Sequence, residues 1–288
     1  MTEGKIVKQI SNDYTVNVNN KLYVCKARGK FRNMGITPLV GDNALIDCNA
    51  KYIIEIKKRK NELIRPSIAN VDQAVIVMSN KIPEFSLDLL DKLICIIEYN
   101  NIEPIIYVSK TDLLDEIEKN NLFKILDYYK KIGYRVYADL SIKEVFKDKV
   151  TVFVGQSGAG KSTLLNKLDS TLELLTGDVS YALGRGKHTT RHVELLEVLG
   201  GLIADTPGFS KISFIGMTKG DIRDNFIEFN NYREYCKYKD CMHNLEDDCM
   251  IKKEINNNIL KSRYDNYIKF ISEVEKWYQR QFYQLKTI

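Results

Sequence analysis

The chain has 288 residues, of which 44% are hydrophobic and 28% are charged, with 43 Lys and Arg against 38 Asp and Glu. This composition is typical of a globular protein with more than one domain and excludes a disordered chain. Because no apolar run reaches the length of a signal peptide core or a membrane span, we expect a cytoplasmic protein with no membrane partner. The net charge of +5 is compatible with an RNA partner without establishing one.

Residues 1–65 predict a small β-barrel. Apolar residues alternate roughly over residues 7–18, and a turn at Asn19 and Asn20 leads into a further apolar run at residues 22–25. Short strands are also predicted at residues 44–46 and 52–56. Five or so strands without a helix favour a barrel, and we place the linker to the next domain near Arg65 and Pro66.

Residues 66–213 predict an α/β domain with a parallel sheet, because apolar strands alternate with helices. Strands are expected at residues 71–78, 104–108, 134–138 and 150–154. Ser86 is placed to cap a helix, and another helix should cover residues 113–131. Gly200 and Gly201 predict a tight hairpin between residues 193–199 and 202–204.

Residues 214–288 predict a helical domain. Its main element is an amphipathic helix from near Ile255 almost to the end of the chain, with aromatic and aliphatic residues at spacings of three and four. Arg263, Lys269, Lys276 and Arg280 on this helix are basic, but its apolar stripe favours packing over RNA stacking. Cys25, Cys48 and Cys95 are expected to be small core residues.

A phosphate-binding loop follows the strand at residues 150–154. Its glycines let backbone N–H groups turn toward phosphates, Lys161 would reach the β and γ phosphates, and the Ser162 hydroxyl would bind Mg²⁺. A glycine-rich turn with an accidental Lys-Ser pair is the alternative. The residues of the nucleotide site here are Gly155, Gln156, Ser157, Gly158, Ala159, Gly160, Lys161, Ser162 and Thr163.

Two further motifs indicate a guanine nucleotide. In the sequence Asp205-Thr206-Pro207-Gly208, Asp205 would hold Mg²⁺ through water and the Gly208 N–H would sense the γ phosphate, although a simple turn is an alternative. In Ser109-Lys110-Thr111-Asp112, the aspartate can accept hydrogen bonds from guanine N1–H and its amino group, which adenine cannot offer. Ser109 departs from the usual Asn or Thr, and a helix cap on the surface is the alternative reading of this motif.

The order of these motifs predicts a circular permutation. An ordinary GTPase presents the phosphate loop first, whereas here the guanine motif at residues 109–112 precedes it. The same site can survive when old termini are joined and new ones open elsewhere. Residues 138–141 fall where a loop supporting guanine should lie, although their match is weak.

A cluster of three cysteines and a histidine predicts one structural Zn²⁺. Cys236, Cys241, His243 and Cys249 offer three thiolates and an imidazole, a closed tetrahedral set without a free position. Few apolar residues lie between 230 and 250, so the metal should supply much of this module's folding energy.

These features together resemble the ribosome small-subunit-dependent GTPase A family, RsgA or YjeQ. The resemblance covers essentially the whole chain and is carried by residues 155–166, 184–191 and 205–209 and by the Cys/His cluster. It implies an N-terminal OB-fold at residues 1–65, a permuted GTPase domain at residues 66–213 and a zinc domain at residues 214–288. It also implies GTP hydrolysis stimulated by the small ribosomal subunit, and a role in late maturation of that subunit.

The resemblance makes residues 184–191 the first switch loop. Thr190, slightly preferred over Thr189, would complete the Mg²⁺ shell, although a flexible basic loop is an alternative. Phe209 stands where many GTPases place a glutamine that orients water, so intrinsic hydrolysis should be slow. His188 is the leading catalytic candidate beside Lys161 and Thr190, and an RNA contact or a plain loop residue is an equal alternative.

Basic residues suggest where RNA would bind. Lys26, Arg28, Lys30 and Arg32 recur every two residues, so in a strand they would share one face opposite Phe31. A charged edge that prevents aggregation is the alternative. Two other functions stay open: an ATP-dependent enzyme on the same phosphate loop, and a non-catalytic RNA-binding module with GTP as a conformational ligand. We expect a monomer that binds rRNA.

Overall fold

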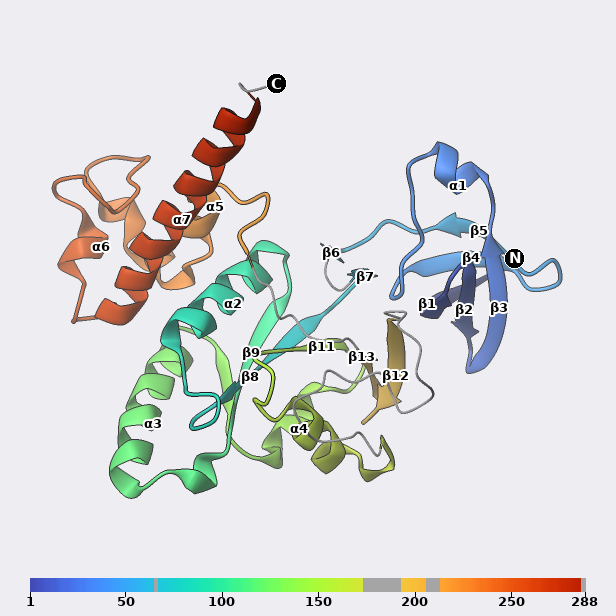
Figure 1. Ribbon diagram of the computed structural model, residues 1–288, viewed down its shortest axis with the longest axis horizontal. Helices are drawn as coiled ribbons and strands as arrows, with labels where there is room; N and C mark the ends of the chain where they lie inside the picture. The colour runs from blue at the N-terminus through green and yellow to red at the C-terminus, as the bar shows by residue number, and fades with distance from the viewer. Residues whose placement is uncertain (65–66, 173–192, 206–212, 286–288) are drawn as a thin grey trace.

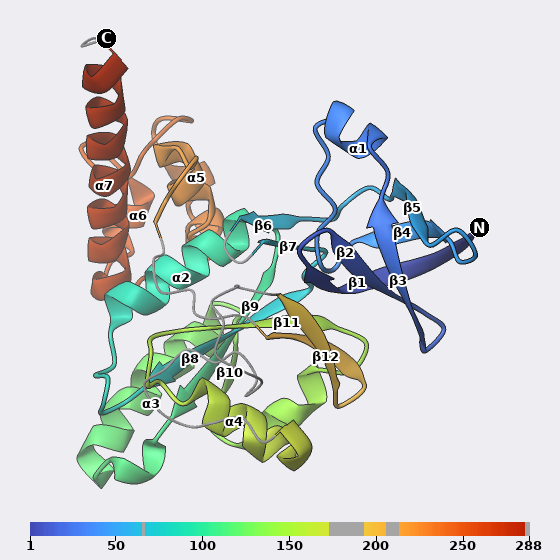
Figure 2. The same cartoon turned by 45° about the vertical axis from the view of Figure 1, so that its right-hand side comes forward.

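The computed structural model describes residues 1–64, 67–172, 193–205 and 213–285. They form a β-barrel, an α/β part and a helical module, in that order along the chain (Figure 1). In Figure 2 the helical module lies at the upper left of the α/β part and the barrel at its upper right. In the described chain, we find no helix with the length and hydropathy of a membrane span.

Five strands close the N-terminal barrel. They are β1 (Thr2–Ile10), β2 (Asp13–Val18), β3 (Lys21–Ala27), β4 (Asn43–Asp47) and β5 (Tyr52–Ile56). β1 pairs with both β2 and β4, and β5 joins β3 to β4, so the ring of strands is continuous. Ile6, Val16 and Ile46 are buried inside it. The predicted barrel and its turn at Asn19 and Asn20 are confirmed.

A short helix corrects the prediction of one basic strand face. β3 ends at Ala27, and Lys30–Asn33 form α1. Gly29 favours an end to the strand. Phe31 is buried, in agreement with its predicted place opposite the basic residues, but the backbone that carries it is helical. Lys26 and Lys30 therefore lie on different elements and form no single row.

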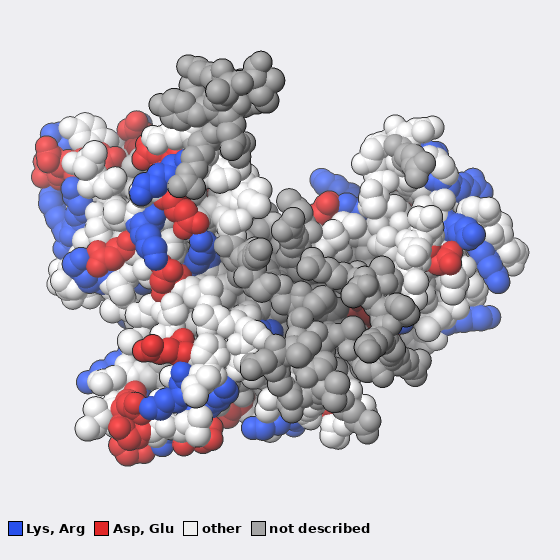
Figure 3. Space-filling view, viewed as in Figure 1, with Lys and Arg blue, Asp and Glu red and all other residues white. Residues whose placement is uncertain are grey.

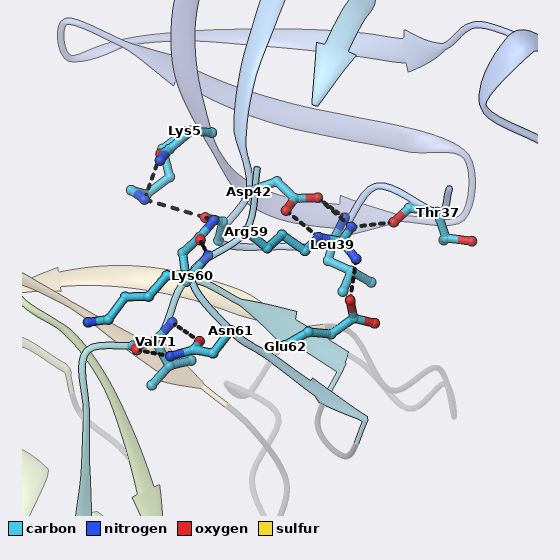
Figure 4. Close-up of polar contacts among 12 residues, drawn as sticks. Lys5, Thr37, Leu39, Asp42, Arg59, Lys60, Asn61, Glu62 and Val71 are labelled. Carbon is cyan, nitrogen blue, oxygen red and sulfur yellow. Dashed lines mark hydrogen bonds and ion pairs between the residues drawn. The ribbon is translucent and has the colours of Figure 1, made fainter. Parts of the chain in front are cut away.

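Hydrogen bonds and ion pairs connect the barrel to the segment that follows β5 (Figure 4). The Arg59 guanidinium donates to both carboxylate oxygens of buried Asp42 at 2.8 Å and to the Thr37 carbonyl at 2.6 Å. The Asn61 amide then bonds both the N–H and the carbonyl of Val71, as a paired strand would. Between them, β6 (Glu62–Ile64) and β7 (Ser67–Ala69) form a hairpin, and the predicted linker residues 65–66 lie outside the described residues.

The central sheet has the order β10-β9-β8-β11-β13-β12 and continues into β1 of the barrel. β8, β9, β10, β11 and β13 run parallel, and β12 is antiparallel to β13. The strands are β8 (Gln73–Ser79), β9 (Glu103–Ser109), β10 (Arg135–Tyr137), β11 (Val150–Val154), β12 (Glu194–Val198) and β13 (Gly201–Asp205). The predicted parallel sheet and hairpin are confirmed.

Helices cover both faces of this sheet because its central strands are apolar on both sides. Ile76 and Ile106 pack with α2 (Leu87–Tyr99) and α3 (Glu116–Lys131), whereas Val77 and Phe153 pack on the opposite face with α4 (Lys161–Leu168). Ser86 caps α2 as predicted, accepting from the Leu89 N–H. Short 3₁₀ turns occupy Thr111–Leu113, Leu140–Val145 and Ser170–Leu172.

The helical module packs on α2. It contains α5 (Lys219–Asp224), 3₁₀ turns at Ile227–Asn231 and Arg233–Tyr235, α6 (Met250–Lys253) and α7 (Lys261–Leu285). α7 begins six residues later than predicted from Ile255, since Asn256 takes a left-handed backbone. Phe226, Phe229 and Tyr267 form its core. Cys25 and Cys95 are buried as expected, and Cys48 is half-buried.

Candidate nucleotide site and metal centre

The three nucleotide motifs meet at one edge of the sheet. Ser109 ends β9, Gly155 follows β11, and Asp205 ends β13. Because these strands are parallel, their carboxyl ends lie on the same side, where α/β sheets bind ligands. β8 lies between β9 and β11, so the guanine motif and the phosphate loop follow strands that are not neighbours in the sheet.

The phosphate loop, residues 155–162, depends on its glycines. Gly155, Gly158 and Gly160 have positive φ angles of 137°, 75° and 94°. A Cβ on Gly155 would lie 2.2 Å from the Val77 carbonyl oxygen, so no larger residue fits there. α4 begins within this segment, at Lys161, so its first-turn N–H groups directly follow the last of the glycines. This arrangement of backbone donors suits an anion such as a phosphate chain.

Lys161 lies across the loop rather than extending into solvent. Its Nζ donates to the Gly155 carbonyl at 2.8 Å and to the Gln156 carbonyl at 2.6 Å. Burial lowers the pKa of Lys161 to about 8. A phosphate bound in this loop would stabilise the protonated ammonium group of Lys161.

The guanine-reading loop, residues 109–112, is bonded directly to the phosphate loop. The Ser109 hydroxyl donates to the Ala159 carbonyl at 2.6 Å, and Lys110 Nζ donates to the Gly158 carbonyl at 2.9 Å. Lys110 Nζ also donates to the Ile82 carbonyl, and the Lys110 backbone is left-handed with φ 58°. Asp112 is exposed just beyond β9. Ser109, which departs from the usual Asn or Thr, thus bonds the guanine-reading loop to the phosphate loop.

The loop at residues 138–141 lies next to this site. It follows β10, which pairs in parallel with β9, so both loops leave the same edge of the sheet. Asp139 holds the loop by accepting from the Ser141 N–H at 2.8 Å and the Ser141 hydroxyl at 2.5 Å. The role predicted for this loop, supporting the base, stays a prediction.

Several predicted residues lie outside the described part of the chain. These are Thr206, Pro207, Gly208 and Phe209, together with the proposed switch residues His188, Thr189 and Thr190. Asp205 is placed as the last residue of β13, without a described side chain. The roles predicted for all of them stay predictions.

The predicted metal ligands converge in the helical module. The ligand atoms of Cys236, Cys241, His243 and Cys249 lie within 4.8 Å of one another. His243 Nδ1 is 3.6 Å from Cys236 Sγ and 3.4 Å from Cys249 Sγ, and these two sulfurs are 4.0 Å apart. A tetrahedral zinc site with Zn–S bonds of about 2.3 Å has sulfur–sulfur edges of about 3.8 Å. The four residues therefore fit a zinc ion.

Burial tunes the charge of this cluster. It lowers the pKa of His243 to about 4, so the imidazole is neutral and Nδ1 can be a ligand. Burial, with a smaller effect of neighbouring thiols, raises the pKa of Cys241 to about 12. A divalent cation would reverse that shift by stabilising the thiolates. The Met250 N–H, 3.4 Å from Cys236 Sγ, adds a hydrogen bond to one sulfur.

Comparison with known proteins gives the same result as the site geometry. The RsgA GTPase model matches residues 56–215, and the RsgA N-terminal domain model matches residues 3–51. The chain belongs to the RsgA GTPase family. It is 47% identical to "Small ribosomal subunit biogenesis GTPase RsgA 2" of Oceanobacillus iheyensis, over 96% of this chain and 98% of that one. A relative from Enterococcus faecalis, "Small ribosomal subunit biogenesis GTPase RsgA", is 45% identical over 99% of both.

Solved structures in the RsgA family confirm the fold class. "The crystal structure of YloQ, a circularly permuted GTPase" matches with a TM-score of 0.82 and 38% identity, over 96% of each chain. YjeQ from Thermotoga maritima matches with a TM-score of 0.82 and 31% identity, over 95% of this chain and 98% of that one. The predicted circular permutation and GTPase class are therefore confirmed.

The barrel of this RsgA chain presents basic and apolar groups together. Lys21, Lys26, Arg28 and Lys30 are exposed, and Figure 3 shows mainly positive charge on the visible barrel face, whereas the helical module mixes both signs. The Arg28 guanidinium lies 5.8 Å from the centre of the exposed Tyr52 ring. Such a surface suits a phosphate backbone with bases that can stack.

Sequence reasoning missed two residues of the RsgA architecture. Asn80, at the end of β8, donates to the Ser109 carbonyl. Its position directly after an apolar strand was the available signal. Arg263, interpreted as one of the basic residues along α7, is instead 1% exposed and bonded to Asp91 and Glu228. Spacing within α7 could not reveal partners that lie 172 and 35 residues away.

Proposed function

We propose that this protein binds the small ribosomal subunit, assists its late maturation, and hydrolyses GTP to GDP and phosphate with stimulation by the subunit. The observation that carries the nucleotide part is the bonding of Ser109 and Lys110 to the phosphate loop, which joins base recognition to phosphate binding. The names of relatives similar along nearly the whole chain support the ribosomal part.

The proposed guanine site uses the four residues Ser109, Lys110, Thr111 and Asp112. The exposed Asp112 carboxylate would accept from guanine N1–H and the amino group, while the Lys110 stem would lie along the base. Lys110 is suited to this because two carbonyls hold its Nζ. The Ser109 hydroxyl would keep the base and the phosphates at a fixed spacing.

The proposed phosphate site combines the backbone of residues 155–160 and Thr163 with the Lys161 ammonium group. Ser162, in the first turn of α4, would bind Mg²⁺ together with Thr190 and with Asp205 at the end of β13. Bound Mg²⁺ would neutralise charge on the phosphates. The Gly208 N–H would contact the γ phosphate.

The attacking water needs a group that Phe209 cannot supply, because a phenyl ring accepts no proton and orients no water. We propose His188 for this task, so His188→Ala should lower GTP turnover stimulated by the subunit while leaving GDP affinity unchanged. His188→Gln tests whether hydrogen bonding alone is sufficient. Unchanged stimulated turnover in His188→Ala would remove His188 from the mechanism.

We also propose one structural Zn²⁺ on Cys236, Cys241, His243 and Cys249. Their burial and mutual distances support a closed site without a position for substrate. The barrel is the proposed rRNA contact because it exposes several cations, of which Arg28 lies near the exposed Tyr52 ring. We further propose a cytoplasmic monomer whose domains are residues 1–65, 66–213 and 214–288.

The deciding experiment measures GTP turnover with purified small subunits, with large subunits and alone. We expect marked stimulation by small subunits and none by large ones. Equal rates in all three conditions would favour a module that uses GTP as a conformational ligand. ATP binding as tight as GTP binding would favour a different phosphate-loop enzyme.

Asp112→Asn tests the guanine site separately. An asparagine amide repels the guanine amino group but can donate to the carbonyl that xanthine carries at that position. We expect the GDP affinity to fall at least about ten-fold, as for one lost charge-assisted hydrogen bond, and the xanthosine diphosphate affinity to rise. Unchanged GDP binding would show that residues 109–112 do not read the base.

A further inference from the structure

Asn80 occupies the point where the sheet reaches the nucleotide edge. β8 and β9 pair along their whole length, and the last register pair joins Ser79 to Ser109. Beyond that pair the backbone ladder ends. The Asn80 side chain continues it, because Asn80 Nδ2 donates to the Ser109 carbonyl at 2.9 Å. A side chain therefore makes the last bond between β8 and the guanine-reading loop.

This bond fixes a peptide unit with an unusual backbone. The Ser109 carbonyl belongs to the peptide that enters Lys110, and Lys110 is left-handed with φ 58°. Residues other than glycine adopt this conformation only when their surroundings hold them there. Asn80 holds the peptide from one side, and the Lys110 ammonium holds the residue from the other through Ile82 and Gly158.

Asn80 is buried at a cost to the fold. The residue is 9% exposed, and Asn80 Oδ1 has no hydrogen-bond partner among the described residues. Reversing the amide would place Oδ1 against the Ser109 carbonyl oxygen, so chemistry fixes the observed orientation. Buried polar atoms are nearly always paired, and Asn80 satisfies the Ser109 carbonyl while its own acceptor has no partner among the described residues.

We propose that Asn80 is a positioning residue for guanine discrimination, acting through the Ser109 carbonyl on the guanine-reading loop. It does not contact the base. It fixes the backbone from which Asp112 projects, and thereby holds the carboxylate where both guanine donors can reach it. The inference rests on the proposed role of residues 109–112 in reading the base.

The test compares GDP with inosine diphosphate, which lacks the amino group. Both nucleotides offer N1–H to Asp112, but only GDP offers the second donor, so their affinity ratio reports how well Asp112 is placed. In the full-length chain, we expect Asn80→Ala to weaken GDP binding about ten-fold, or about 1.4 kcal/mol, and inosine diphosphate binding clearly less. Asn80→Asp keeps the shape of the side chain and removes its hydrogen-bond donor. It should therefore lower the ratio of GDP affinity to inosine diphosphate affinity at least as much as Asn80→Ala does.

Asn100→Ala is the matched control. The Asn100 amide also donates to a backbone carbonyl, that of Ile96 at 2.7 Å, but it precedes β9 and so lies at the opposite edge of the sheet. The ratio of GDP affinity to inosine diphosphate affinity in Asn100→Ala should equal that of the unmodified protein. An unchanged ratio in folded Asn80→Asp, or an equal loss for both nucleotides, would overturn the proposal. If Asp112→Asn shifts binding to xanthosine diphosphate while Asn80 variants keep the ratio, this inference alone fails.

Discussion

Of the changes considered, loss of the Arg263 guanidinium should destabilise the folded protein most. Its guanidinium is bonded to Glu228 through two nitrogens at 2.7 and 2.8 Å and to Asp91 at 2.8 Å, and all three side chains are at most 1% exposed. Tyr129 and Asn266 also donate to Asp91. Since Asp91 lies on α2 and Arg263 on α7, this cluster joins the α/β part to the helical module.

Arg263→Met should destabilise the protein by about 3–5 kcal/mol, because two buried carboxylates lose their counter-ion. Such a loss is a large share of the roughly 5–15 kcal/mol that stabilises a typical protein. The comparison is Lys269→Met, which removes another pair between α7 and α2. Lys269 and Asp88 are 61% and 40% exposed, so that change should cost about 1 kcal/mol or less.

The fluorescence of Trp277 reports unfolding of the helical module, because Trp277 is the single tryptophan of the chain and lies on α7. Urea unfolding followed by its fluorescence should show a much lower midpoint for Arg263→Met than for Lys269→Met. Equal midpoint shifts in the two variants would refute the reasoning, since burial would then add nothing to the pair.

The deficit of Arg263→Met should also depend on pH. Burial already raises the pKa of Asp91, with Arg263 opposing that shift, and removing Arg263 raises it further. A carboxyl whose pKa is higher in the folded state than in the unfolded state binds more protons when folded, so stability falls as pH rises through that interval. The deficit should therefore shrink in mildly acidic buffer. A deficit that grows on acidification would contradict this account.

Three further changes test other parts of the structure. GDP affinity should fall as pH rises through about 8, the pKa to which burial lowers Lys161, and Lys161→Arg should bind with little pH dependence over this range. Cys249→Ser should lower the zinc content measured by metal analysis, whereas Cys95→Ser, buried in the same core, should keep it. Gly41→Ala should lower the melting temperature more than Gly35→Ala: both have positive φ, but only at Gly41 does a Cβ meet a carbonyl oxygen, at 2.0 Å.

The nucleotide motifs were predictable because each depends on local sequence. Glycines fix the phosphate loop, and an apolar strand precedes both Gly155 and Ser109. Parallel strands then bring their carboxyl ends together whatever their order in the chain. Because each motif can be recognised locally, their order along the chain was sufficient to predict the permutation.

The interpretation failed where burial depends on distant partners. Basic residues at every second position suggested one strand through Lys30, but β3 ends at Ala27 and Lys30–Asn33 form a helix. The charge of Arg263 suggested solvent exposure, and only its partners on other elements make burial tolerable. Asn80 likewise acquires its bond from the pairing of β8 with β9, which the residues of either strand alone do not specify.

The permuted order explains how two additional parts can adjoin one nucleotide site. In the sheet, β8 and β13 both flank β11, the strand that leads into the phosphate loop. Along the chain, the barrel precedes β8 and the helical module follows β13, so these two parts lie next in sequence to the two neighbours of that strand. Downstream of β13, Phe214 packs against Phe270 of α7, so the helical module is anchored close in sequence to the end of β13. A GTPase that began with its phosphate loop would place these attachments on other strands.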